Sequence, residues 1–496
     1  MQRHRAVVGR WVVGVIFLGL VDCSGRQPTL FTGGNRSASK RSGGKRSTGS
    51  TTNQGSTDAI AIPHFDWVGI VGTGQSLAVG QPPARSLTQP YNNLMLSLEG
   101  VTVPANSNAG DPWDTSSSAF KMVPLVEPMR SLLHASGCCS YPGNLFGETP
   151  HAAMGNEITR FVKAASAGAD YITVHTAVGE AGRGISVINK QTGSTTGDYG
   201  RAYAATLFEV GVITRLAKAA NKTYGVGMLM MTHGEADTFN TAYKDQLIQL
   251  MVDTNIDISA ITGQTYKIPM YLSQQNTFPV PGTGEARSIS SNAQWQMGVE
   301  HKGDFVCTGP KYQYQGHDPG QLDGVHLSAV GYQMLGEKTA QVYYERAVLG
   351  HDWQPLQPTH VERSGRVVTV HFNVPVPPLN WDTTFASPVI TEWANGKGFE
   401  LRVKNSDALQ DLADTTSNII IESVAISGDS VQVTASSDLP TNNLVVGYAF
   451  TSQGQQLADH SGASRWGQLR DSDTFTGGTT SLPNPNYCVG FEIPVP

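Results

Sequence analysis

The stretch WVGIVGTGQSLAVG, residues 67–80, decides how the first part of the chain is interpreted. A short apolar run ends in a glycine-rich turn, and Ser76 follows that turn. Continuous apolar runs of this length suit strands buried on both faces, and Gly72 and Gly74 permit a tight turn. Ligands of an open parallel sheet collect at the carboxyl ends of its strands. Ser76 therefore stands either in an ordinary Gly-Ser turn or in the place of a nucleophile at a strand end.

Similar apolar runs recur along the chain, separated by amphipathic stretches. The spacing predicts helices over 201–220, 241–254 and 328–349, the last with Ser328 as its N-cap. Strands that alternate with helices indicate a parallel sheet with helices on both faces, a three-layer α/β/α architecture. Region 80–160 is rich in Pro, Gly and Asn, and we expect long loops there that shape the substrate side. The predicted strands after the first are 171–178, 225–232, 268–274 and 303–309.

After about residue 355 the pattern changes to short strands of period two with few helix signals. This pattern predicts a second domain, a β-sandwich, over 353–496. The sequence SGDS at 427–430 lies between two of these strands and predicts a hairpin turn. We expect the catalytic domain to occupy 59–352.

The first 23 residues are typical of an export signal, with a positive start and the apolar core WVVGVIFLGLV. The core is too short to span a bilayer stably. The end, LVDC, resembles the lipobox of bacterial lipoproteins, in which Cys23 takes the lipid, although Asp22 departs from the small residue expected there. Residues 24–58 have almost nothing to bury and predict a disordered Ser/Gly/Lys-rich linker. The alternative for 1–23 is an uncleaved apolar N-terminus.

The charge is distributed unevenly along the chain. Residues 1–50 hold nine Lys and Arg and one acid, which leaves 25 basic and 39 acidic residues for the remainder. The folded part is therefore acidic, which argues against nucleic acid as its main partner.

Five cysteines favour one or two disulfides in an exported protein. Four remain if Cys23 is lipidated or removed, namely Cys138, Cys139, Cys307 and Cys488. A bridge between the adjacent pair would be strained, so we expect Cys138 or Cys139 to pair with Cys307, although spacing alone does not fix the pairing. No CxxC or Cys/His cluster has the spacing of a zinc site, so we predict no metal site.

The segment QLDGVHLSAVG at 321–331 precedes the last predicted helix of the catalytic domain. Asp323 and His326 are three residues apart, which lets the carboxylate bind one imidazole nitrogen while the other faces a cleft. Such a histidine can deprotonate a serine and later protonate the leaving alkoxide. A capping aspartate beside a surface histidine explains the same residues.

Polar or glycine-rich segments also follow two other predicted strands. AVGEAGRGIS at 177–186 contains Gly182 and Gly184, which would let a backbone N–H approach a ligand closely. MMTHGEADT at 230–238 brings His233 and Glu235 directly after a buried apolar run. Each segment alone is explained nearly as well by a solvated turn. A GxSxG elbow, a GxGxxG fingerprint and a P-loop do not occur here.

Taken in order, these segments resemble the SGNH (GDSL-like) hydrolase superfamily, and most of all its sialate O-acetylesterase and carbohydrate-acetylesterase branch. That branch has GQS first and QGESD in the middle. The resemblance covers roughly 66–349; GQS and DGVHL are the specific matches, and HGEAD departs from QGESD by having His233 in place of glutamine. The resemblance implies a flavodoxin-like three-layer sheet and hydrolysis of esters without a cofactor.

The resemblance also implies roles for individual residues. Ser76 matches the nucleophile, His326 the base and Asp323 the acid that orients it. The oxyanion hole would use the N–H of Ser76, of Gly182 or Gly184, and a ring N–H of His233. Because an ionised carboxylate cannot donate, Glu235 is assigned an orienting role, and the expected supporting residues are Gln75, Gly234 and Glu235.

We therefore interpret the chain as an exported serine esterase, secreted or anchored to the cell envelope, that removes acetyl groups from a polysaccharide or sialic acid. One alternative is an esterase for a lipid or polyester. The other is a surface carbohydrate-binding protein without activity, with Trp381, Trp393 and Trp466 as candidates for sugar stacking. Core packing is the more common role of such residues.

Overall fold

The computed structural model describes residues 64–101, 113–129, 141–143, 145, 147–166, 168–191, 197–277, 287–315, 325–384, 390–405, 417–452 and 465–496. These residues all belong to one compact unit, Ser56–Pro496. The predicted export signal with Cys23 and the whole predicted linker, 24–58, lie outside the described ranges. Three further residues of interest also lie outside them. Those three are Asp323, Cys138 and Cys139.

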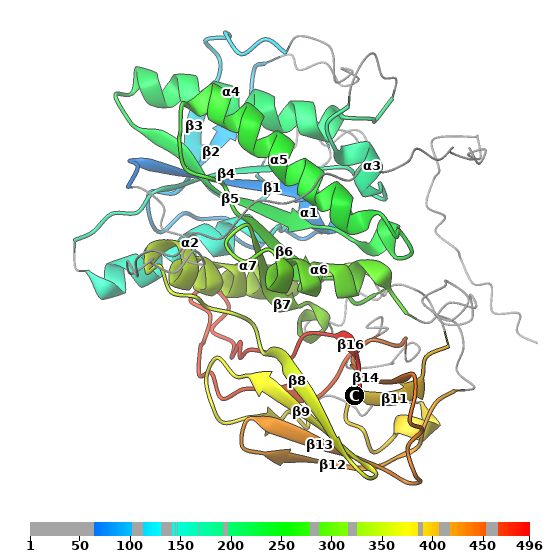
Figure 1. Ribbon diagram of the computed structural model, residues 1–496. Helices are drawn as coiled ribbons and strands as arrows, with labels where there is room; N and C mark the ends of the chain where they lie inside the picture. The colour runs from blue at the N-terminus through cyan, green and yellow to red at the C-terminus, as the bar shows by residue number, and fades with distance from the viewer. Residues whose placement is uncertain are drawn as a thin grey trace, which may run out of the picture. The chain divides into compact units, whose positions relative to one another are not determined.

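A seven-stranded sheet with the order β3-β2-β4-β1-β5-β6-β7 forms the centre of the first part of the chain (Figure 1). Its strands are parallel except β3, which pairs antiparallel with β2 at one edge. Without this edge pair the order is β4-β1-β5-β6-β7, the flavodoxin-like arrangement. The strands are β1 (Trp67–Gly74), β2 (Leu94–Ser97), β3 (Lys121–Pro124), β4 (Thr173–Gly179), β5 (Tyr224–Thr232), β6 (Met270–Gln274) and β7 (Phe305–Pro310).

Helices cover both faces of this sheet (Figure 1). α3 (Ile185–Ile188), α4 (Arg201–Ala219) and α5 (Tyr243–Thr262) lie on one face. On the other face, α2 (His151–Ala165) packs against α7 (Ala329–Tyr343), which continues into a short π-helical turn, η4 (Tyr344–Val348). The three-layer α/β/α prediction is thus confirmed. The remaining helix, α6 (Ile289–Glu300), lies beside β6 and β7, and the Oγ of Ser328 caps α7 as predicted, accepting from the N–H of Gly331 (3.1 Å).

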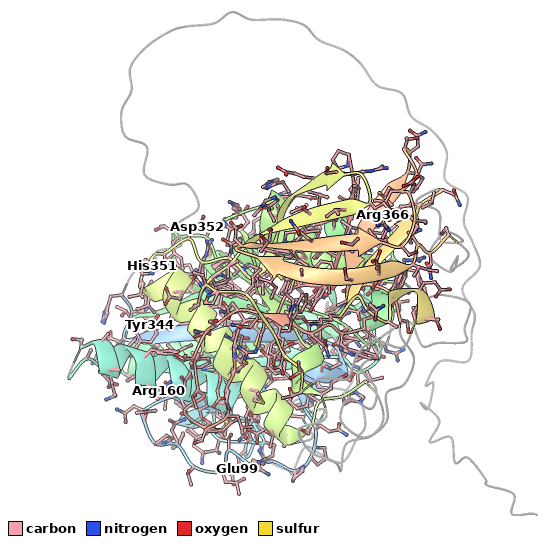
Figure 2. All side chains as sticks on the ribbon, turned by 90° about the horizontal axis from the view of Figure 1, so that it is seen from below. Glu99, Arg160, Tyr344, His351, Asp352 and Arg366 are labelled. Atoms are coloured by element: carbon pink, nitrogen blue, oxygen red, sulfur yellow. The ribbon has the colours of Figure 1, made fainter. Side chains whose placement is uncertain are left out.

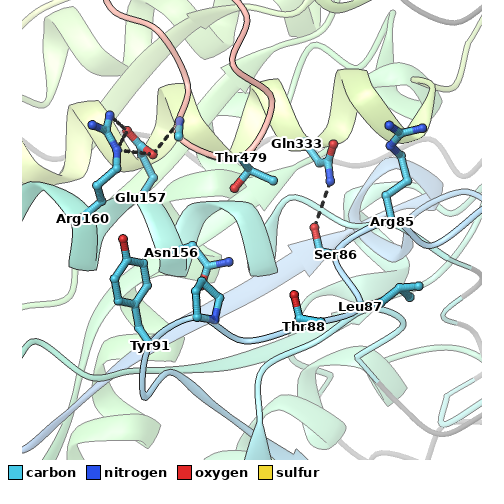
Figure 3. Close-up of a pocket in the computed structure, with 12 residues that line it drawn as sticks. Arg85, Ser86, Leu87, Thr88, Tyr91, Asn156, Glu157, Arg160, Gln333 and Thr479 are labelled. Atoms are coloured by element: carbon cyan, nitrogen blue, oxygen red, sulfur yellow. Dashed lines mark hydrogen bonds and ion pairs between the residues drawn. The ribbon is translucent and has the colours of Figure 1, made fainter.

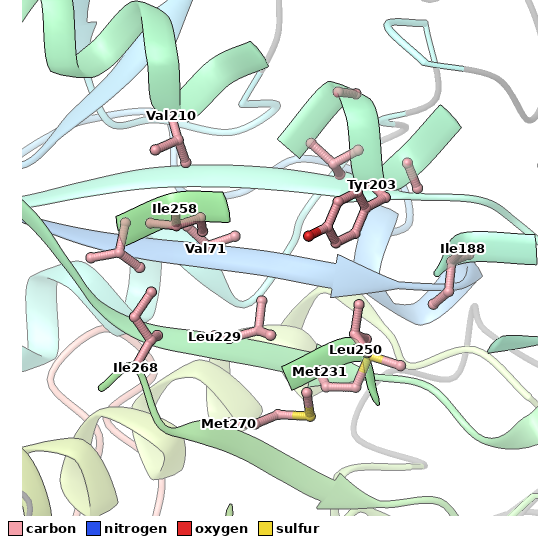
Figure 4. Close-up of a cluster of buried hydrophobic side chains, with 14 of the residues drawn as sticks. Val71, Ile188, Tyr203, Val210, Leu229, Met231, Leu250, Ile258, Ile268 and Met270 are labelled. Carbon is pink, nitrogen blue, oxygen red and sulfur yellow. The ribbon is translucent and has the colours of Figure 1, made fainter. Parts of the chain in front are cut away.

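The sheet separates two hydrophobic clusters because its strands are buried on both faces. Val71, Leu229 and Met231 face α4 and α5 (Figure 4). Ile70 and Met230, which alternate with them along the strands, join the cluster formed with α2 and α7. This double burial explains why the strand sequences are continuous apolar runs rather than alternating ones.

The expectation of long loops over region 80–160 is wrong for its last part, because 151–165 forms helix α2. The buried face of this helix contains His151, Gly155, Asn156, Glu157 and Thr159 beside its apolar residues. Met154, Ile158 and Phe161 recur at helical spacing, but the helix directly follows a stretch rich in Pro and Gly whose composition indicates loops. The sequence did not indicate β2 and β3, because each strand is only four residues long.

The C-terminal part consists of antiparallel sheets, as predicted. A four-stranded sheet, β12-β13-β9-β8, and a three-stranded sheet, β11-β14-β16, share one hydrophobic core, and β10 pairs with β15. The SGDS turn is confirmed, because Ser427 pairs with Ser430 across the β12–β13 hairpin. The strands are β8 (Gln357–Ser364), β9 (Val367–Asn373), β10 (Asn380–Trp381), β11 (Phe399–Val403), β12 (Ile421–Ser427), β13 (Ser430–Ala435), β14 (Leu444–Tyr448), β15 (Leu469–Arg470) and β16 (Phe491–Pro494).

The tryptophans of this part have mainly structural contacts. Trp393 and Trp466 are each 1% exposed and belong to the hydrophobic core. Trp381 is half-buried, packs on the same core and has the Lys397 ammonium 4.6 Å from its ring centroid. Core packing therefore accounts for Trp393 and Trp466.

The C-terminal part packs on β6, α6 and α7 through buried hydrogen bonds. The Gln274 side chain, at the end of β6, donates to the carbonyl of Gly490 (2.6 Å) and accepts from the N–H of the same residue (2.7 Å). The indole N–H of Trp295 in α6 donates to Gln357 Oε1 (3.0 Å). These bonds explain why both parts of the chain form one compact unit.

The predicted disulfide at Cys307 is not present, because Cys307 and Cys488 are both free and buried. Burial raises the pKa of the Cys307 thiol to about 12. Cys307 lies within β7 and behaves as a small apolar residue of a buried strand. None of the described helices combines the length and the apolar character needed to cross a membrane.

A buried histidine pair, one residue in α2 and one in β4, predicts that acid lowers the stability of the fold. The Nδ1 atoms of His151 and His175 lie 3.0 Å apart, and burial, with the neighbouring His151, holds the pKa of His175 well below its usual 6.5. Above pH 6.5 both the folded and the unfolded chain keep this ring neutral. As the pH falls below 6.5, the unfolded chain binds a proton that the folded chain does not bind. The free energy of unfolding therefore decreases until the pH reaches the pKa of His175 in the folded state.

We expect His175→Asn to lower the unfolding midpoint at pH 7.5 but to lose less stability than the native protein between pH 7.5 and 5.5. Urea unfolding at the two pH values measures this difference. An equal loss of stability in both proteins over this interval would show that His175 does not carry the effect.

Candidate active site

Ser76 lies where the order of the strands reverses. It is the half-buried first residue of α1 (Ser76–Val79), just past the carboxyl end of β1, which lies between β4 and β5. Gly74 has a φ of +144°, and a Cβ there would lie 2.0 Å from the carbonyl oxygen of Thr232. Only glycine fits this close approach, so the turn that presents Ser76 depends on it.

Hydrogen bonds tie the GQS turn to the loops that follow both neighbouring strands. The N–H of Glu180, after β4, donates to the Gly74 carbonyl (3.0 Å). On the other side, the N–H of Gln75 donates to the Thr232 carbonyl (3.2 Å), and its buried side-chain Oε1 accepts from the N–H of Ala236 (3.1 Å). Three of the four candidate segments therefore meet at the carboxyl ends of the central strands.

The glycine-rich loop after β4 is fixed by Asp237. Gly182 has a φ of +70°, and Gly184 is the N-cap of α3. Asp237 Oδ2 accepts from the N–H of Ile185 (2.6 Å), and a Cβ at Gly184 would lie 3.1 Å from the same oxygen. Within the described part of the chain, the N–H groups of Gly182 and Gly184 donate to no other group. Both remain candidates to bind an oxyanion.

Both ring nitrogens of His233 are engaged by the protein. Nε2 lies 3.0 Å from the Arg183 carbonyl and Nδ1 lies 3.1 Å from the Tyr243 hydroxyl. A carbonyl can only accept, so Nε2 carries the proton and Nδ1 accepts from the tyrosine. An oxyanion contact by His233 would break one of these bonds. The arrangement favours a different role, in which His233 holds the glycine-rich loop through Arg183.

Glu235 forms a buried ion pair that the sequence did not reveal. Lys311, just past β7, donates to Glu235 Oε1 at 2.8 Å, and each side chain is 1% exposed. Burial opposes ionisation of Glu235, but the Lys311 ammonium outweighs it and lowers the pKa of this carboxyl. Glu235 is therefore charged at neutral pH, which agrees with an orienting role. Lys311 directly follows a buried apolar strand, as HGEAD does, so the same sequence pattern could have indicated it.

The C-terminal part of the chain also reaches the HGEAD loop. The buried Arg465 donates through Nη2 to Gln275 Oε1 (2.7 Å) and to the Gln275 carbonyl (3.1 Å). The amide group of Gln275 donates to Ser290 Oγ (3.1 Å), which donates to the carbonyl of Gly234 (2.7 Å). Gly234 itself has a φ of +123°. This chain of bonds could not be found from sequence because it joins four distant segments.

His326 is half-buried and lies two residues before the N-cap of α7. The carbonyl of its neighbour Val325 accepts from Gln315 Nε2, just past β7, at 3.5 Å. Leu327, on its other side, belongs to the same hydrophobic cluster as Leu77, which follows Ser76. Asp323 lies outside the described residues, so its predicted bond to His326 stays a prediction.

A cavity of about 520 Å³ opens elsewhere, alongside α2 and α7 (Figure 3). Its walls include an ion pair, Glu157 with Arg160, and a hydrogen bond from Gln333 to Ser86 (3.0 Å). Ser76 and His326 are not among the lining residues, so this cavity is not the predicted reaction site. It is lined by Arg85, Ser86, Leu87, Thr88, Pro90, Tyr91, Asn156, Glu157, Arg160, Gln333, Gly478 and Thr479.

No family model and no curated protein matches the sequence. The structure is similar to that of XAC1771, a carbohydrate acetylesterase from Xanthomonas citri, with a TM-score of 0.51 and 12% identity over 86% of this chain and 80% of that one. The fold is that of a known carbohydrate acetylesterase. The matched share exceeds what residues 59–352 can supply, so the likeness extends into the C-terminal sheets. It confirms the fold that the resemblance to SGNH hydrolases implied.

Two other solved structures have more distant likeness, with TM-scores too low to support an argument. NanS matches 57% of this chain and 98% of its own at 13% identity and a TM-score of 0.35. Est24, a carbohydrate acetylesterase from Sinorhizobium meliloti, matches 55% and 97% at 14% identity and a TM-score of 0.28.

Proposed function

We propose that this chain is an exported serine esterase that removes acetyl groups from a carbohydrate. The observation that carries the proposal is the convergence of the GQS, GEAGRG and HGEAD segments around the end of β1. Ligands of such sheets bind at the point where the strand order reverses. The fold likeness to XAC1771, whose description names a carbohydrate acetylesterase, supports the substrate class.

In the proposed reaction the Oγ of Ser76 attacks the carbonyl carbon of the acetyl ester, and His326 accepts the hydroxyl proton. The tetrahedral intermediate then collapses, the C–O bond to the sugar breaks, and His326 returns the proton to the leaving sugar oxygen. Water, deprotonated by the same imidazole, then attacks the acyl carbon. The bond from that carbon to Ser76 Oγ breaks, acetate leaves, and His326 returns the proton to Ser76 Oγ. Asp323 orients His326 and stabilises the imidazolium.

Backbone groups are the proposed oxyanion donors. The N–H of Ser76 and that of Gly182 or Gly184 would bind the developing charge, since preorganised N–H groups stabilise it without rearrangement. Asp237 and His233 keep the glycine-rich loop in place through Ile185 and Arg183. Glu235 and Gln75 hold the adjacent HGEAD loop.

The substrate class predicts a preference for short acyl chains. We expect kcat/KM for p-nitrophenyl acetate to exceed that for the octanoate ester by at least about 10-fold, because a pocket shaped for acetyl excludes added methylenes. We also expect acetate release from an O-acetylated polysaccharide or from O-acetylated sialic acid. Release of p-nitrophenolate measures the chain-length preference, and enzymatic measurement of acetate checks the release from the carbohydrates, each with Ser76→Ala as the blank.

Faster turnover of the octanoate ester would contradict the acetyl preference and favour a lipid or polyester substrate. Binding of the acetylated glycan with no acetate release from the native chain would instead favour a non-catalytic carbohydrate-binding protein. Export, and a lipid at Cys23, remain part of the proposal and rest on residues 1–23 alone.

A further inference from the structure

Two histidines and a glutamate meet on the outer face of the four-stranded sheet. His360 on β8 pairs directly with His371 on β9, and Glu362 follows His360 by two residues on the same face. One ligand atom from each of the three residues lies within 4.8 Å of the others. The alternate residues of β9, Val370 and Phe372, point into the core, so this cluster faces away from it.

Both Nε2 atoms converge on one carboxylate without a hydrogen bond to it. His360 Nε2 lies 3.7 Å from Glu362 Oε1, and His371 Nε2 lies 3.8 Å from Glu362 Oε2, both too long for hydrogen bonds. Two ligands of a tetrahedral zinc ion are about 3.3 Å apart, given bonds of about 2.0–2.2 Å. His371 Nε2 is buried and has no hydrogen-bond partner in the described part of the chain. The three side chains are therefore spaced nearly as ligands around an ion.

The Nδ1 atoms of the two histidines lie near groups that favour metal binding by Nε2. The Thr359 hydroxyl donates to the carbonyl of His371 (3.2 Å), so it must accept from Nδ1–H of His360 (3.3 Å). This tautomer leaves a lone pair on His360 Nε2, the atom that faces Glu362. Asp429, in the β12–β13 turn, lies with Oδ1 3.9 Å from His371 Nδ1 and adds negative charge. Metal-binding histidines usually have a hydrogen-bond partner on the second nitrogen, and Thr359 is that partner for His360.

The two imidazole rings are stacked, with centroids 4.0 Å apart and planes 7° from parallel. The in-plane lone pairs of two parallel rings cannot both point at one ion, so metal binding requires one ring to rotate away from the stacked arrangement. The His360 side chain is 56% exposed and can rotate, whereas His371, at 25%, is more confined. We expect His360 to make this adjustment.

We propose that His360, Glu362 and His371 bind a divalent first-row transition metal of the zinc class, with water in the remaining position. Two imidazoles and one carboxylate suit Zn²⁺, whereas Mg²⁺ and Ca²⁺ prefer oxygen ligands alone. The ion would join β8 to β9 on the outer face of the accessory sheet. Residue spacing alone does not reveal this site, because the register of two strands brings the ligands together.

Calorimetric titration of the full chain with ZnCl₂ tests the proposal. We expect one saturable site that disappears in the His360→Ala and His371→Ala variants, while Thr359→Val weakens the affinity by about 10–100-fold. His351→Ala is the matched control, because His351 is an exposed histidine that contacts Glu345 at a distance of 2.7 Å (Figure 2). That variant should bind zinc as the native chain does.

Unfolding midpoints measured without metal show whether the variants fold. We expect little change, because both histidines lie on the outer face of the sheet and outside the hydrophobic core. Zinc should raise the midpoint of the native chain and of His351→Ala, but not that of the two ligand variants. No saturable binding to the native chain, or equal binding to a folded His360→Ala/His371→Ala double variant, would overturn the site. Neither result bears on ester hydrolysis, so the proposed function is tested separately.

Discussion

Replacing Ser76 with alanine is expected to lower kcat for acetyl-ester hydrolysis by about 10⁴–10⁶-fold, because the variant cannot form the acyl-enzyme. Ser76 is half-buried at the end of β1, and it is not one of the core residues. We therefore expect the unfolding midpoint of the variant to stay near that of the native protein. Steady-state hydrolysis of p-nitrophenyl acetate and thermal unfolding measure the two effects.

Ser97 provides the matched control for this substitution. It is also half-buried and ends a strand of the same sheet, β2, which runs parallel to β4. Ser97→Ala should keep its activity. If Ser76→Ala hydrolyses the ester within about threefold of the native rate, Ser76 is not the nucleophile.

Lys311→Met is expected to lower the free energy of unfolding by about 3–5 kcal/mol, the cost of leaving a buried charge without its partner. Glu235 and Lys311 are each 1% exposed and 2.8 Å apart, so water cannot replace the lost ammonium. Because Glu235 lies in the loop bonded to Gln75, we also expect loss of activity. Urea unfolding monitored by fluorescence gives the free energy.

Two further variants separate the charge effect from the loss of side-chain contacts. Adding Glu235→Gln to Lys311→Met removes the unpaired charge and should recover a large part of the lost stability. Lys244→Met, which breaks the exposed pair with Glu300, should cost only about 0–1 kcal/mol. A cost for Lys311→Met as small as that of Lys244→Met would contradict the account of the pair.

The sheet could be predicted from sequence because its central strands are buried on both faces. Residues 225–232 form a continuous apolar run, and the structure places β5 over Tyr224–Thr232. Helix α2 was missed although Met154 and Ile158 follow helical spacing, because it directly follows a stretch rich in Pro and Gly that indicates loops. The free Cys307 shows a further limit. The sequence around a free cysteine buried in a strand does not differ from the sequence around a cysteine that forms a disulfide.

The candidate site was predictable to the extent that its residues follow apolar runs. Ser76 and Glu235 each lie a few residues after the end of a strand, and the carboxyl ends of parallel strands lie at the same side of a sheet. Lys311 also follows an apolar run, but its pairing with Glu235 could not be inferred, because it depends on the tertiary contact between two loops. Arg465 comes from the C-terminal part, 190 residues after Gln275, the residue that it contacts, and only tertiary packing shows the contact.

The most direct test of the account is the site at which a fluorophosphonate probe modifies the full-length protein. The reagent reacts with a serine hydroxyl whose proton a neighbouring base can remove, and peptide mass spectrometry locates the adduct. We expect one adduct on Ser76, absent from Ser76→Ala and formed much more slowly in His326→Ala. An active protein in which Ser76 stays unmodified, or a His326→Ala variant labelled at the native rate, would contradict the proposed pair.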